Sequence, residues 1–110
     1  MRLERGPVVC ERCELAVTAL SRTRGLLGRR GLDDDQGLWI HPTNSIHMAF
    51  MRFPIDVVYA REDGRVLKLV EGIKPWRASL CRGAKVALEL PTGAIARAGV
   101  EVGDHLVLER

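Results

Sequence analysis

Residues 37–59 read Gly-Leu-Trp-Ile-His-Pro-Thr-Asn-Ser-Ile-His-Met-Ala-Phe-Met-Arg-Phe-Pro-Ile-Asp-Val-Val-Tyr, and this stretch decides the fold. It contains two of the three histidines, both phenylalanines and the only tyrosine of the chain. Apolar and β-branched residues dominate it, as is typical of strands, and Pro42 and Pro54 interrupt it where strands end. A histidine and a single aspartate set into this apolar pattern indicate a folded β domain with a candidate polar site.

The rest of the chain continues this pattern of short strands separated by turns. We predict strands within residues 8–18, 38–41, 46–51, 55–60, 65–73, 84–90 and 105–109. The Asp63-Gly64 pair predicts a tight hairpin turn, and Thr92 and Gly99 are predicted to cap and end a short helix. A first short helix is predicted over 21–28. The predicted fold is mainly β, a compact sandwich-like or barrel-like domain of about seven or eight short strands with two short helices.

Composition and length limit the classes of protein to which the chain can belong. Its 110 residues predict a single domain over 1–110, with 46% hydrophobic and 28% charged residues. No apolar run approaches the ~18 residues of a membrane span, and the first residues lack the apolar centre of a signal peptide. We therefore expect no membrane span and, by default, a cytoplasmic protein. The net charge of +3 is weak support for nucleic acid, which we do not expect as a partner.

The cysteines leave two interpretations open. Cys10 and Cys13 have the spacing of half a zinc site or of a redox pair. Residues three apart face opposite sides of a regular strand, however, and no second pair stands at zinc-finger spacing. We interpret them as ordinary strand cysteines and predict no cofactor and no metal site.

Arginines flank the first predicted helix. Arg24 and Arg29 stand on either side of the apolar pair Leu26-Leu27. A half-buried arginine needs an acidic partner, and Asp56 and Glu89 are the acids that stand within apolar strand patterns. We therefore predict at least one arginine–acid pair between the first helix and the sheet.

Four motifs stand in order along the chain. They are Arg24-Gly25-Leu26-Leu27-Gly28-Arg29, Ser45-Ile46-His47 leading to Met51-Arg52-Phe53-Pro54-Ile55-Asp56, Leu88-Glu89-Leu90-Pro91-Thr92-Gly93 and Val102-Gly103-Asp104. Together they resemble a known family, the domain of unknown function family 192 of bacteria and archaea, over roughly residues 17–108. The resemblance implies a compact, mainly β, sandwich-like domain and no assigned catalytic residue; some relatives look exported or membrane-anchored. The chain departs from it at Thr43, where relatives often carry Cys, and at Met48, where they often carry Thr.

His47 and Asp56 are the best pair for chemistry. If strands 46–51 and 55–60 form an antiparallel hairpin, the two residues share a face as diagonal neighbours about 7–8 Å apart. A carboxylate beside an imidazole raises its pKa and fixes its tautomer, which suits a general base. A shift of one residue in register would separate them.

These residues support three hypotheses of different classes. The first is a non-enzymatic binding or accessory domain for a small polar ligand or a protein partner. The second is a small hydrolase or metal-dependent enzyme that uses His47 with Asp56. The third is a subunit of a larger assembly, recognised through an exposed patch around Trp39 and Trp76, and the oligomeric state is left open. The predicted ligand-binding set is Arg24, Arg29, His41, His47 and Asp56.

Overall fold

A mixed five-stranded sheet with the strand order β2-β3-β8-β5-β6 organises the molecule. The computed structural model describes residues 1–17, 26 and 29–108. Strands β2 and β3 run parallel, and every other neighbouring pair in the sheet is antiparallel. The strands of this sheet are β2 (Arg12–Ala16), β3 (Gln36–Ile40), β5 (Ile55–Ala60), β6 (Val66–Ile73) and β8 (Val86–Pro91).

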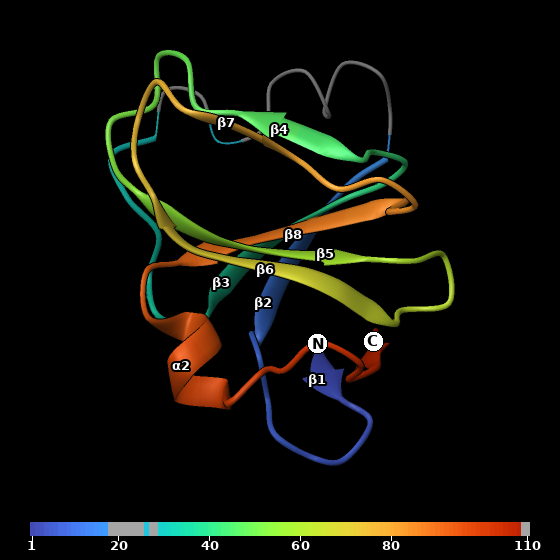
Figure 1. Ribbon diagram of the computed structural model, residues 1–110. Helices are drawn as coiled ribbons and strands as arrows, with labels where there is room; N and C mark the ends of the chain where they lie inside the picture. Colours follow the sequence, from blue (N-terminus) through green and yellow to red (C-terminus); the bar gives the residue numbers. More distant parts are fainter. Residues whose placement is uncertain (18–25, 27–28, 109–110) are drawn as a thin grey trace.

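Smaller elements cover the two faces of the sheet (Figure 1). Helix α2 (Ala94–Ala98) and the pair formed by β1 (Arg2–Leu3) and β9 (Leu106–Val107) lie on one face. The antiparallel ribbon of β4 (Ser45–His47) and β7 (Ala78–Leu80) lies across the other face. The result is a layered, sandwich-like arrangement around an open sheet.

Each face of the sheet packs into its own apolar cluster. Val86, Leu88 and Leu90 of β8 belong to the cluster on the α2 face, as the predicted alternation requires. Ala87, which points the other way, belongs to the cluster beneath the ribbon, together with Ile46 of β4. Every residue of β5 and β8 is buried, because both strands are flanked by other strands and covered on both faces.

The predicted fold class is confirmed, and the described residues form nine strands rather than about seven or eight. The turn at Asp63-Gly64 joins β5 to β6 as predicted. Helix α2 ends at Gly99 as predicted, but its N-cap is Gly93 and not Thr92. The helix predicted over 21–28 lies outside the described residues. In the part of the chain that the structure describes, no helix is long and apolar enough to cross a membrane.

The predicted hairpin between strands 46–51 and 55–60 is wrong. β4 ends at His47 and pairs with β7, whereas β5 pairs with β6 and β8. The chain turns after β4, where the backbone N–H of Met51 donates to the carbonyl of Met48 at 3.1 Å and Phe50 has a φ of 63°. His47 and Asp56 therefore belong to different layers.

Candidate functional site

Asp56 is a buried anchor for backbone groups and not part of an open site. Its side chain is on the α2 face and is 1% exposed. Oδ1 accepts the N–H of Gly72 at 2.8 Å, and Oδ2 accepts the N–H groups of Gly93 and Ile95, each at 3.1 Å. Because Gly93 has no side chain with which to cap α2, the sheet supplies the capping carboxylate.

His41 and Arg29, two further members of the predicted set, have separate partners. His41 Nε2 lies 2.9 Å from Glu62 Oε1 near the β5–β6 turn, and Arg29 Nη2 lies 2.6 Å from Glu14 Oε2 of β2. Arg24 lies outside the described residues. Within the described part of the chain, no hydrogen bond or ion pair joins two members of the predicted set, so the structure does not bring the set together in one site. Ligand binding by the individual residues stays a prediction.

The predicted arginine–acid pair exists with a different acid. Arg29 reaches from the segment that follows the first predicted helix to Glu14 of β2, rather than to Asp56 or Glu89. Glu89 is 6% exposed, and burial raises the pKa of its carboxyl to about 7, while the charge of Arg29 acts in the opposite direction. The sheet therefore holds a carboxyl group that is easily protonated near neutral pH.

Beneath the ribbon, Tyr59 is a second buried polar group. Its side chain is fully buried, and its hydroxyl has no hydrogen-bond partner among the described residues. Burial raises the pKa of this phenol, which therefore stays neutral. Tyr59 and Glu89 are therefore buried polar groups beneath the ribbon, as Asp56 is on the α2 face.

The ribbon carries an open pocket of about 690 Å³ on its surface. Its β4 strand presents His47 and Ser45 as exposed residues, while Ile46 between them is buried. Lys68 of β6 reaches the ribbon, where its Nζ donates to the carbonyl of Leu80 at 2.9 Å. The lining residues are Ser45, Ile46, His47, Lys68, Ala78, Ser79 and Leu80.

Two loops extend the ribbon beyond His47. The N–H of Met48 donates to the carbonyl of Arg77 at 2.7 Å, and the N–H of Trp76 donates to the carbonyl of Met48 at 2.8 Å. These bonds hold segment 48–54 against segment 74–77. The rings of Phe50 and Trp76 meet edge to face, with centroids 4.8 Å apart. We call these two residues the aromatic tip.

The aromatic tip is both exposed and strained. Phe50 is 72% exposed and Trp76 is 65% exposed. Their φ angles are 63° and 69°, in the left-handed region that bulky L-residues rarely adopt. Backbone strain of this kind persists where the surrounding structure enforces it, and it clusters at functional sites.

The two tryptophans do not form a shared patch. Trp39 of β3 is partly buried against the cluster on the α2 face, whereas Trp76 lies on the ribbon side with Phe50. The predicted surface around Trp39 and Trp76 is therefore wrong. The sequence predicted roles for Trp76 and His47 but not the ring contact between Trp76 and Phe50. That contact depends on the pairing of β4 with β7, which no local sequence pattern indicates.

Comparisons with known proteins agree with this fold. A UPF0127 protein of Thermococcus sibiricus is 32% identical over 108 residues, which cover 93% of this chain and 69% of that relative. A UPF0127 protein of Pyrococcus furiosus is 42% identical over 67 residues. The match covers 60% of this chain and only 57% of that relative's length.

Two solved structures share the architecture. A protein of unknown function from Novosphingobium aromaticivorans is similar with a TM-score of 0.76 and 27% identity over 84% of this chain and 71% of that chain. A Sinorhizobium meliloti protein, whose name proposes a transcription regulator, is similar with a TM-score of 0.77 and 29% identity, over 84% of this chain and 78% of that chain. The DUF192 family, described as "Uncharacterized ACR", matches residues 3–108. The chain therefore belongs to the DUF192 family.

Proposed function

We propose that this chain is a non-enzymatic binding domain whose ligand is a small organic anion with a planar ring. The binding surface is the ribbon pocket together with the aromatic tip. The observation that carries the proposal is the exposed Phe50–Trp76 pair, held in a strained backbone conformation beside basic side chains. Exposed aromatic rings contribute contact area at low cost in conformational entropy, and a planar ligand can stack on them.

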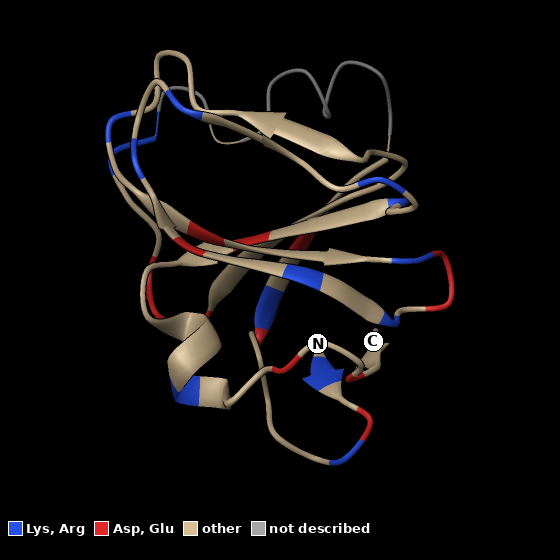
Figure 2. Cartoon of the chain, in the orientation of Figure 1, with Lys and Arg blue, Asp and Glu red and all other residues tan. Residues whose placement is uncertain are grey.

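The charge around the tip favours an anion. Segments 48–54 and 74–77 contain Arg52, Lys74 and Arg77 and no acidic residue, and all three side chains are exposed. Within the described part of the chain none of them forms an ion pair. Figure 2 places basic positions at the loop end of the ribbon, where the chain leaves β4 and enters β7. Arginine and lysine left without acidic partners can bind carboxylate or phosphate groups.

The pocket adds hydrogen-bonding groups next to the tip. The His47 imidazole has no hydrogen-bond partner among the described residues, and Ser45 and Ser79 line the same pocket. These groups can donate to or accept from a polar ligand. The arrangement supports binding rather than catalysis, because Asp56 lies on the opposite face of the sheet and its oxygens accept three backbone N–H groups.

Three probes separate the contributions of ring and charge. Phenyl phosphate carries both features, inorganic phosphate carries only the charge, and benzyl alcohol carries only the ring. We expect isothermal titration and NMR chemical shifts to show tightest binding for phenyl phosphate, with perturbed amides in segments 45–54 and 74–80. Weaker binding of phenyl phosphate than of inorganic phosphate would overturn the proposal.

Matched variants test the location of the site. Arg77→Gln should weaken phenyl phosphate binding, whereas Arg82→Gln, just beyond the other end of β7, should leave it unchanged. His47→Ala should weaken it, and His105→Ala should not. If a thymidine oligomer binds and phenyl phosphate does not, the surface is a nucleic-acid site and the small-anion proposal fails.

A further inference from the structure

Cys10 and Cys13 lie on the same side of the chain, contrary to the expectation for a regular strand. The backbone N–H groups of Glu11 and Arg12 both donate to the carbonyl of Asp35, at 2.9 and 2.8 Å. Glu11 forms a bend just before β2, so the alternation of side chains along the strand does not extend to Cys10. As a result the buried cluster on the α2 face contains Cys10, and Cys13 packs against the same cluster.

A glycine makes room for the two thiols. Gly37 of β3 is the register partner of Cys13. A Cβ atom at Gly37 would lie 2.8 Å from Cys10 Sγ, which is closer than side-chain atoms pack. The sulfur of Cys10 therefore lies beside Gly37, the residue of β3 that is paired with Cys13, in space that a larger side chain at Gly37 would fill.

The two thiols differ in accessibility and in acidity. Cys10 is 2% exposed, whereas Cys13 is half-buried. A hydrogen bond between the two side chains lowers the pKa of Cys13 and raises that of Cys10. Cys13 is therefore the nucleophile of the pair and Cys10 the thiol that resolves a mixed disulfide.

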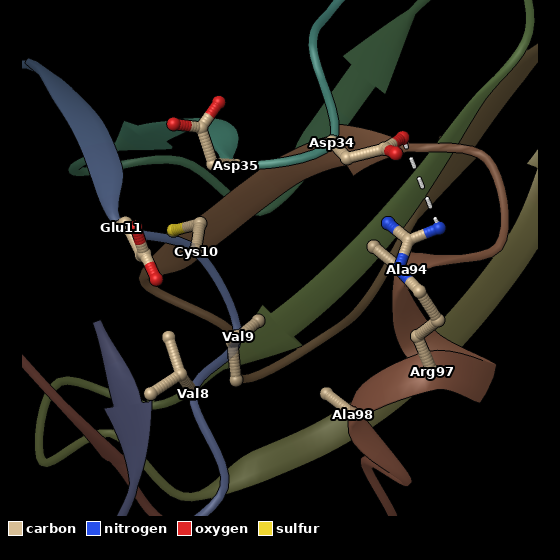
Figure 3. Close-up of a pocket in the computed structure, with 9 residues that line it drawn as sticks. All are labelled: Val8, Val9, Cys10, Glu11, Asp34, Asp35, Ala94, Arg97 and Ala98. Carbon is tan, nitrogen blue, oxygen red and sulfur yellow. Dashed lines mark ion pairs between the residues drawn. The ribbon is translucent and has the colours of Figure 1, made fainter.

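A pocket of about 300 Å³ borders Cys10. Figure 3 shows Cys10 beside Glu11, with Arg97 of α2 across the pocket, where Arg97 Nη1 lies 3.9 Å from Asp34 Oδ1. The lining contains three acidic residues, Glu11, Asp34 and Asp35, and a single basic residue, Arg97. Cationic groups balance these acids: Arg97 pairs with Asp34, Arg12 Nη2 lies 2.7 Å from Asp35 Oδ1, and the Met1 ammonium donates to the carbonyl of Cys10 at 3.0 Å. The pocket can therefore admit a small reagent without selecting for its charge.

We propose that Cys10 and Cys13 form a reversible intramolecular disulfide by exchange with a small aliphatic disulfide. The Cys13 thiolate attacks one sulfur of the reagent, forms a mixed disulfide and releases one reagent thiolate. Cys10 gives up its proton and attacks the Cys13 sulfur, which forms the Cys10–Cys13 bond and releases the second reagent thiolate. The protein dithiol is oxidised by two electrons and the reagent disulfide is reduced to two thiols.

The experiment exposes the full chain to cystamine, a small aliphatic disulfide. Because trypsin cleaves after Arg12, between the two cysteines, an internal disulfide leaves the two peptides linked in an unreduced digest. Alkylation after denaturation should label three cysteines in reduced protein and only Cys81 after oxidation.

Single-cysteine variants identify the order of attack. Cys10→Ser should accumulate the mixed disulfide on Cys13, while Cys81→Ser should react as the wild type does. Wild-type protein that keeps three alkylated cysteines after exposure to cystamine would overturn the proposal. A mixed disulfide confined to Cys81 would also overturn it. None of these results depends on the ribbon surface.

Discussion

Asp56 Oδ2 accepts the backbone N–H of Ile95 at 3.1 Å, across 39 residues of sequence. This bond connects β5 to the first turn of α2, the helix that covers one face of the sheet. The same carboxylate also accepts the N–H of Gly72 near the end of β6, where the register of the β5–β6 pair shifts. A single side chain of β5 therefore holds both the irregular part of this strand pair and the start of α2.

We predict that Asp56→Asn lowers the free energy of unfolding by about 2–4 kcal/mol, because a buried charge-assisted acceptor is replaced by an amide that brings two donors. Urea denaturation followed by circular dichroism measures the change. Asp34→Asn is the matched control, since the Asp34 side chain is 90% exposed and should change stability by less than about 0.5 kcal/mol. Equal stability of Asp56→Asn and wild type would refute the anchoring role.

Glu89 should make the fold less stable as the pH rises. Burial raises its pKa from the ordinary 4.5 to about 7, so between these values the folded state binds more protons than the unfolded state. Stability therefore falls as pH rises through this window. We expect Glu89→Gln to match wild type near pH 4 and to exceed it by roughly 3 kcal/mol at pH 8.

Denaturation at a series of pH values tests this difference. Glu14→Gln serves as the control, because the Glu14 side chain is 54% exposed and should leave the shape of the profile unchanged. Parallel stability profiles for Glu89→Gln and wild type across pH 4–8 would show that Glu89 is not the group responsible.

Gly37→Ala should destabilise the protein by about 2 kcal/mol, because the added methyl group meets Cys10 Sγ. Removing that sulfur should offset part of the cost. In a double-mutant cycle, the variant that carries both Gly37→Ala and Cys10→Ala should be more stable, by about 1 kcal/mol, than the sum of the two single effects predicts. The rescue should be incomplete, because the same methyl group would lie 3.1 Å from Leu90 Cδ2. Additive effects of the two substitutions would mean that the sulfur does not fill this space.

The backbone at Trp76 should favour glycine over alanine. Trp76 has a φ of 69°, which only glycine adopts without strain. We therefore expect the Trp76→Gly variant to be more stable than the Trp76→Ala variant by about 1 kcal/mol. At Leu80, an exposed residue of β7, the order should be reversed. Thermal unfolding of the four variants makes the comparison. The same order at both positions would contradict strain at the aromatic tip.

Local pattern predicted much of the architecture. The run 55–60 became β5 with the predicted bounds, because five of its six residues are apolar or β-branched, which suits a strand buried on both faces. The run 46–51 looked equally apolar, but only its first two residues belong to a strand, which begins at Ser45. Nothing in its composition shows that Phe50 adopts a positive φ, which a bulky residue does only under tertiary constraint.

The candidate sites depended on pairings that composition does not encode. Asp56 was correctly identified as unusual within an apolar strand, but its partners are backbone N–H groups, which carry no residue-specific signal. The bend at Glu11, whose N–H donates to the carbonyl of Asp35, ends the strand alternation before Cys10. Cys10 and Cys13 therefore face the same side and not, as was predicted, opposite sides. The positions of several strands were predictable from local sequence pattern, whereas the contacts between distant segments were not.

The β1–β9 pair has a consequence for the order in which the core is completed. Leu3 lies opposite Leu106, so a residue made before the five-stranded sheet packs against one made after it. Until translation reaches Leu106, Leu3 and the apolar surface that β9 will cover stay open to water and to other chains. This part of the core therefore closes only after the sheet has been synthesised, and until then a nascent chain needs protection from association.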